Sequence, residues 1–203
     1  MDFTSLIAQV VDTLGEQITT AQATSLLPFV EARLNRLVDH PSREVEATII
    51  PVAASTTLPT DCWRVRDVAR DDTADVSLRQ MTPDAARTLY GLSTGKYVAY
   101  SIQGAAIKLW PEPEATSTDT IIIRYQQTIP ALSASELTNW LIDSYPDVYY
   151  YGLLVQSEAY IVNDERVGMW KAAFDESLSE LGLDAKRRRY GASPLVAYPY
   201  SYA

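Results

Sequence analysis

Apolar side chains recur with two different periods along this chain, and the change of period limits the folds open to it. Near both ends they return every three or four residues, as on one face of a helix. In the middle they alternate with polar residues, which is typical of half-buried strands. The order of these periods predicts an α+β fold, with a helical bundle formed by both chain ends and a small antiparallel β module inserted in it.

The expected division of the chain follows from the same pattern. Residues 1–43 are predicted to form the N-terminal helices of the bundle, and residues 129–185 its C-terminal helices. Residues 44–128 are predicted to form the inserted β-rich module. Residues 186–203 have too little aliphatic surface to fold alone, so they are expected to form an extended arm.

Two helices are expected before residue 44. Thr4 can cap the first, and Gly15 stands where the end of that helix is expected. The second is expected to begin near Pro28, since proline suits a first helical turn, and to end at Pro41. Its predicted buried face consists of Leu27, Val30, Leu34 and Leu37.

The helical period returns near the C-terminal end. Pro146 can begin one helix, and Asn163 or Asp164 can cap the next. Gly182 is the expected end of that last helix. Its predicted buried face is marked by Val167, Trp170, Phe174, Leu178 and Leu181.

Short alternating segments separated by turn residues predict strands in the middle of the chain. They cover residues 44–52, 63–68, 97–102, 106–110 and 120–125. Thr82 and Pro83 predict the start of a short helix that ends near Gly91. Trp63 and Trp110 lie inside two of the strands and are expected in the core.

The charge is unevenly distributed. The chain has 17 basic and 26 acidic residues, a net charge of −9. Residues 186–203 contain four basic residues and no acid, which leaves a net charge of −13 in residues 1–185. Because affinity for phosphates comes mainly from Lys and Arg, such a body is a poor non-specific binder of nucleic acid.

The sequence contains few residues suited to catalysis. The sole histidine, His40, is interpreted as a helix-dipole contact at a helix end. The sole cysteine, Cys62, excludes an internal disulfide and argues against a cysteine-based zinc site. Asp71-Asp72 and Asp164-Glu165 suit a turn and a helix start better than a metal site. No glycine-rich phosphate loop is present, and we expect no enzyme activity, cofactor or metal.

The sequence also leads us to expect a soluble protein that matures in a reducing compartment. The segment after Met1 has no positively charged start and no long apolar stretch, so no secretory signal is visible. No segment approaches the roughly 18 apolar residues of a membrane span. We therefore expect no contact with a membrane.

Three consecutive tyrosines, Tyr149, Tyr150 and Tyr151, stand in a predicted helix. Consecutive helical residues point about 100° apart, so all three rings cannot enter one core. At least one ring is expected either at a subunit interface or partly exposed.

The C-terminal segment combines basic and aromatic residues, a composition that suits docking on an acidic surface or on a strand edge. It is interpreted either as a disordered end or as an arm that becomes ordered on a partner. Its candidate binding residues are Lys186, Arg187, Arg188, Arg189, Tyr190, Tyr198, Tyr200 and Tyr202.

Short motifs stand in a consistent order along the chain. They are Glu31–Arg36, Leu58–Asp61, Leu109–Pro113, Tyr125–Ser133, Thr138–Leu141, Tyr145–Tyr149, Glu158–Tyr160 and Asn163–Arg166. Taken together, they resemble the head–tail adaptor proteins, or connectors, of tailed bacteriophages, and the resemblance covers about residues 26–181. Cys62 departs from it, since an aromatic residue is expected there, and the segment after Gly182 carries no family motif.

The resemblance implies a structural part of the virion, located in the neck between the capsid portal and the tail and assembled in the host cytoplasm. Such subunits form a ring, commonly a dodecamer, beneath the portal protein ring. The ring extends the DNA channel and provides a docking platform for tail or nozzle proteins. The acidic body would let genomic DNA pass without specific binding, and the arm of residues 186–203 would bind the portal.

Three alternatives remain open on the sequence. The first is a tail-tube or tail-completion protein that contacts tail components and not the portal. The second is a small enzyme with the β module as a lid, and the third is a regulatory protein that binds DNA through its basic tail. An adaptor should form a ring on a template, and an enzyme should bind a small ligand. A regulatory protein of this kind should bind DNA with a steep dependence on salt concentration.

Overall fold

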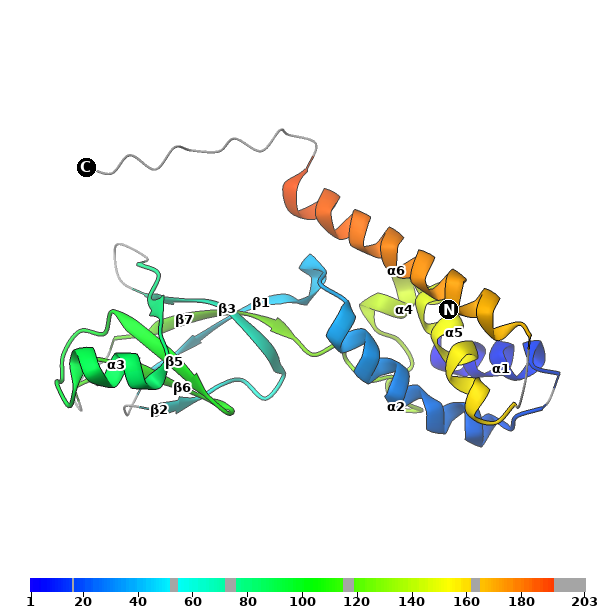
Figure 1. Ribbon diagram of the computed structural model, residues 1–203, viewed down its shortest axis with the longest axis horizontal. Helices are drawn as coiled ribbons and strands as arrows, with labels where there is room; N and C mark the ends of the chain where they lie inside the picture. Colours follow the sequence, from blue (N-terminus) through cyan, green and yellow to red (C-terminus); the bar gives the residue numbers. More distant parts are fainter. Residues whose placement is uncertain (16, 52–54, 72–75, 115–118, 162–164, 192–203) are drawn as a thin grey trace. The chain divides into compact units, whose positions relative to one another are not determined.

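The computed structural model describes residues 1–15, 17–51, 55–71, 76–114, 119–161 and 165–191 (Figure 1). The chain divides into two compact units. One consists of residues 1–42 together with the chain from residue 129 onward, and the other of residues 43–128. The described residues form six α-helices and two small sheets, which confirms the predicted α+β class.

The first unit is helical. Its α-helices are α1 (Phe3–Thr13), α2 (Thr20–Leu37), α4 (Trp140–Ser144), α5 (Pro146–Gln156) and α6 (Val167–Tyr190), and a 3-10 turn, η2 (Ser157–Ala159), follows α5. These helices share one apolar core, because each presents a buried face at helical spacing. The core includes Leu6, Val10, Leu27, Leu34, Leu153, Phe174 and Leu181.

The starts of α1 and α2 differ from the prediction. Asp2 caps α1 in place of Thr4, because its carboxylate accepts a hydrogen bond from the Ser5 backbone at 2.8 Å. Thr19 caps α2 in the same way, which places Pro28 inside the helix rather than at its start. Helix α2 then ends at Leu37. The prediction that Leu37 belongs to the buried face was wrong, because its side chain is 52% exposed.

Helix α6 is longer than predicted. Its buried residues Trp170, Phe174 and Leu181 confirm the expected apolar face. The helix continues past Gly182 to Tyr190, and Gly191, with a φ of +61°, ends it. Residues 186–190 are therefore its last turns and not an extended arm. The predicted caps at 163 and 164, and the arm residues 192–203, lie outside the described part of the chain.

The second unit contains two sheets and one α-helix, α3 (Pro83–Tyr90), among its described residues. The strands are β1 (Glu44–Ile49), β2 (Ser55–Thr57), β3 (Cys62–Arg70), β4 (Arg79–Gln80), β5 (Ala99–Gln103), β6 (Ala106–Trp110) and β7 (Ile121–Gln127). The first sheet has the order β1-β7-β3, and all its pairs are antiparallel. The second has the order β2-β6-β5-β4, in which β4 runs parallel to β5, so the expected antiparallel module has one parallel pair.

The two strand tryptophans have different environments. Trp110 is buried as predicted, and its indole N–H donates to Ser101 Oγ at 3.0 Å. Trp63 is 43% exposed, contrary to the prediction. The reason is that the pairing of β3 with β7 shifts register between Cys62 and Arg64 and again before Asp67. Such bulges break the strict alternation of buried and exposed positions.

Candidate interaction surfaces

His40 is a core residue and not the helix-dipole contact that the sequence suggested. It is 1% exposed, lies beyond the end of α2 and stacks on Trp140 with ring centroids 5.0 Å apart. Its Nδ1 accepts a hydrogen bond from the Ser42 backbone at 3.1 Å, and its Nε2 lies 3.7 Å from Asp184 Oδ2. Burial, assisted by the positive charge of Arg188, lowers the pKa of His40.

Asp184 connects the end of α6 to the rest of the helical unit. Its carboxylate accepts hydrogen bonds from the Tyr145 hydroxyl and from Arg188 Nε, and both lower the pKa of Asp184. Arg189 donates to the Asp39 carboxylate at 3.0 Å. Of the predicted binding arginines, Arg189 therefore links the end of α6 to Asp39, while Arg188 pairs with Asp184 within the same helix.

Two basic residues at the same helix end remain available for a partner. Lys186 and Arg187 have no ion pair within the described residues, and both are exposed. Tyr190, at the last position of α6, is 51% exposed. The predicted binding residues Tyr198, Tyr200 and Tyr202 lie outside the described part of the chain.

The three consecutive tyrosines occupy three different environments. Tyr149 is completely buried, and its hydroxyl accepts a hydrogen bond from Asn139 at 3.0 Å, so its ring cannot face another subunit. Burial raises the pKa of Tyr149. Tyr150 and Tyr151 are half-buried and meet edge to face at 5.3 Å. Of the three tyrosines, only Tyr150 and Tyr151 therefore stay candidates for a subunit interface.

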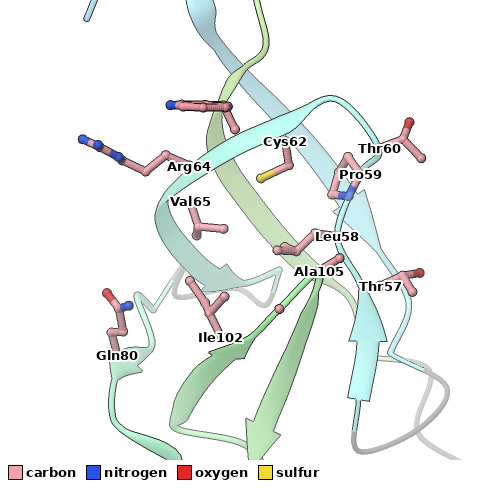
Figure 2. Close-up of a pocket in the computed structure, with 12 residues that line it drawn as sticks. Thr57, Leu58, Pro59, Thr60, Cys62, Arg64, Val65, Gln80, Ile102 and Ala105 are labelled. Atoms are coloured by element: carbon pink, nitrogen blue, oxygen red, sulfur yellow. The ribbon is translucent and has the colours of Figure 1, made fainter. Parts of the chain in front are cut away.

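The β unit contains a groove that the sequence analysis did not predict (Figure 2). Its volume is about 1000 Å³. Leu58, Cys62, Val65 and Ile102 pack against the core of the unit and form the apolar floor. Figure 2 shows Val65 and Ile102 facing one another across this floor. We call this site the β3 groove.

A tight turn before β3 shapes the groove. The Leu58 backbone N–H donates to the Ala105 carbonyl at 2.9 Å, and the Cys62 N–H donates to the Pro59 carbonyl at 3.0 Å. Asp61 accepts a hydrogen bond from the Tyr125 hydroxyl at 3.0 Å. Burial and this hydrogen bond raise the pKa of Tyr125 to about 12. The turn is therefore fixed to both sheets of the β unit.

The surroundings of Cys62 in the groove floor disfavour its charged thiolate form. Its burial, followed by the negative charge of Asp61, raises the pKa of this thiol. Because the thiolate is the nucleophilic form, the environment of Cys62 favours packing over reactivity.

The rim of the groove carries an exposed tryptophan and an unpaired arginine. Trp63 and Arg64 both line it, and no ion pair of Arg64 exists among the described residues. No acidic residue belongs to the described lining. The bulges in β3 bring Trp63 to the rim, and a sequence pattern of plain alternation does not reveal them.

One side of β3 at the groove is an open sheet edge. Strand β7 pairs with one side of β3. On the other side, pairing within the described chain begins at Val68, whose carbonyl accepts from the Leu78 N–H at 2.7 Å. No described strand pairs with Trp63–Val65 on that side.

No metal-binding group and no membrane-spanning helix is found in the described residues. Nowhere in these segments do three or more His, Cys, Asp or Glu side chains gather as metal ligands. None of the described helices is both long and apolar enough to cross a membrane.

Comparison with known families identifies the class of protein to which these surfaces belong. The sequence model described as "SU10 adaptor protein" matches residues 1–197, nearly the whole chain, and represents phage head–tail adaptors. The chain therefore belongs to the SU10 adaptor protein family. This confirms the resemblance drawn from the motifs and places the chain in a family of structural phage proteins, not in a known enzyme family. No curated protein matches the chain.

Proposed function

We propose that this protein is a subunit of a ring that joins the portal to the tail in the neck of a phage particle. The family match over residues 1–197 is the observation that carries this proposal. The ring, a dodecamer in our proposal, extends the DNA channel beneath the portal and provides the platform on which tail or nozzle proteins assemble. Its assembly takes place in the host cytoplasm.

The end of α6 is the proposed portal contact. Lys186 and Arg187 are exposed and lack an ion pair in the described chain, so they can meet acidic groups on the portal. Arg188 and Arg189 support this surface by their bonds to Asp184 and Asp39. Tyr190 and the tyrosines further along the arm, Tyr198, Tyr200 and Tyr202, would fill apolar sites on the portal.

The acidic body supports the role in DNA passage. Residues 1–185 carry a net charge of −13, so a surface facing the channel would repel the phosphate backbone and let DNA move without binding. Lateral contacts between neighbouring subunits are assigned to the helical unit, where Tyr150 and Tyr151 are the candidate interface tyrosines.

The portal contact can be tested by reversing the two available charges. We expect the double variant Lys186→Glu/Arg187→Glu to bind the portal from the same genome at least tenfold more weakly, because like charges would then face each other. The reversal Lys171→Glu, also exposed and on α6, is the matched control. Affinity is measured by pull-down on immobilised portal rings, and circular dichroism confirms the helix content of each variant.

A second variant tests the aromatic arm separately. A chain ending after Gly191 keeps α6 and its contacts to Asp39 and Tyr145, and it lacks Tyr198, Tyr200 and Tyr202. We expect this chain to lose portal binding while its helix content is unchanged. Undiminished binding by both the truncated chain and the charge-reversed variant would contradict the proposed portal contact.

A further inference from the structure

We propose that the β3 groove is the docking site for an extended segment of a tail-side protein. The segment adds a strand to the open edge of β3, places apolar side chains on the groove floor and presents a carboxylate to Arg64. The identity of the partner as a tail-side protein rests on the proposed function, whereas the groove and its chemistry rest on the structure of the β unit.

The open edge of β3 explains why the occupant is an extended chain. A sheet edge offers a row of backbone donors and acceptors, which a peptide can satisfy by adding a strand. The segment Trp63–Val65 has no described strand on the side opposite β7. Because side chains of a strand alternate between two faces, every second residue of the added strand can reach the floor.

The lining of the groove indicates the side chains that the segment carries. Leu58, Val65 and Ile102 provide an apolar floor, so residues that point inward should be aliphatic or aromatic. Arg64 is the one charged residue of the described lining, and it has no ion pair in the described chain. An arginine without a partner, on a protein with a net charge of −9, favours an acidic residue at the matching position.

Trp63 supports a protein partner over a small ligand. Tryptophan and arginine are the residue types most enriched among those that dominate interface energies. Trp63 is 43% exposed and adjoins Arg64 on the same rim. A small molecule would use the floor but not the row of backbone groups along the edge of β3.

Site-specific crosslinking in assembled particles tests the identity of the occupant. Gln80 lines the groove, so the variant Gln80→p-benzoylphenylalanine places a photoreactive group there. The expected product joins the adaptor to a tail-protein segment in which an acidic residue lies within a few residues of apolar ones. The same replacement at Leu92, which is 89% exposed and not part of the lining, is the control.

Two results would overturn the proposal. The first is a crosslink from position 80 to a second copy of this chain, for example to the acidic edge strand Glu44–Ile49. The second is a yield of crosslinked tail protein that is no higher from position 80 than from the control position 92. The particles are first checked for the portal–adaptor complex. If the proposed function is wrong, the particles will lack the adaptor, and this result is distinct from a failure of the crosslink.

Groove variants provide an independent measurement. We expect Arg64→Glu and Trp63→Ala each to weaken addition of the tail protein to the purified portal–adaptor complex at least tenfold, as measured by native mass spectrometry. Arg87→Glu on α3, exposed and outside the groove, is the charge-matched control.

These variants should not change assembly with the portal, which separates the two proposals. Loss of portal binding by Arg64→Glu would show that the β3 groove serves the portal and not the tail, and it would overturn the inference. Unchanged tail addition by both groove variants would overturn it as well.

Discussion

At the scale of single residues, His40 shows how burial changes the role of a side chain. The imidazole lies between Trp140 and Tyr145, with Nε2 3.7 Å from Asp184 Oδ2. The charged groups that act on it are the carboxylate of Asp184 and the guanidinium groups of Arg188 and Arg189. Burial has the largest effect, so the pKa of His40 lies below its ordinary value of 6.5.

This lowered pKa predicts an acid-sensitive fold. Below pH 6.5 the unfolded chain binds a proton at His40 that the folded chain does not bind, so the free energy of unfolding decreases as the pH falls from 7 to 5. The variant His40→Gln should show a smaller decrease over this interval. Urea unfolding at pH 7, 6 and 5 measures both slopes, and equal slopes would mean that His40 does not titrate as described.

Gly152 is a residue at which close packing leaves no room for a side chain. A Cβ at this position would lie 2.8 Å from Val30 Cγ1 and 3.2 Å from Phe174 Cε2. We expect Gly152→Ala to lower the free energy of unfolding by about 1–3 kcal/mol through overpacking. Gly168→Ala is the matched control, since no atom lies within 4 Å of its added Cβ. A stability of Gly152→Ala equal to the wild type would contradict the close packing of α2, α5 and α6.

At the scale of elements, the buried face of α6 could be predicted from the sequence, but its C-terminal end could not. The spacing of Trp170, Phe174 and Leu181 predicted the helix and its buried face. The prediction of an end at Gly182 was wrong, because the apolar period fades there although the helix does not end. The last turns are held by contacts of Asp184 with Tyr145 and of Arg189 with Asp39. Asp39 lies far away in the sequence, so no local pattern could indicate its contact.

The continuous helix predicts opposite effects at two glycines. Gly182→Ala should raise the free energy of unfolding by up to about 1 kcal/mol, because alanine favours the helix interior and nothing lies within 4 Å of the new Cβ. Gly191→Ala should lower it by about 1 kcal/mol, because the φ of +61° at Gly191 is unfavourable for alanine. Thermal unfolding measures both changes. Destabilisation by Gly182→Ala would instead indicate a helix that ends at Gly182.

The strands were predicted more fully than the groove that they form. Alternation located all the longer strands, and the Thr82 cap and Gly91 end of α3 were confirmed. The β3 groove depends on two bulges in β3 and on a turn fixed by Tyr125, a residue distant in the sequence. A one-residue shift of register moves side chains to the other face, which is why Trp63 was wrongly predicted to be buried.

At the scale of the whole molecule, the chain combines two compact units with different surfaces. The helical unit ends in a basic helix terminus, and the β unit contains an open sheet edge beside an apolar groove. Family membership was predictable from short motifs in a consistent order, and the match over residues 1–197 confirms it. We propose that the first surface binds the portal and that the second binds a tail-side protein.

The most direct test of the adaptor role is native mass spectrometry of the full chain co-expressed with the portal protein of the same genome. We expect one discrete complex, in which a complete ring of this chain, expected to be a dodecamer, is bound to one portal ring. A portal ring that carries no copies of this chain, in a preparation where both proteins are folded, would contradict the adaptor role and favour a protein that contacts only tail components.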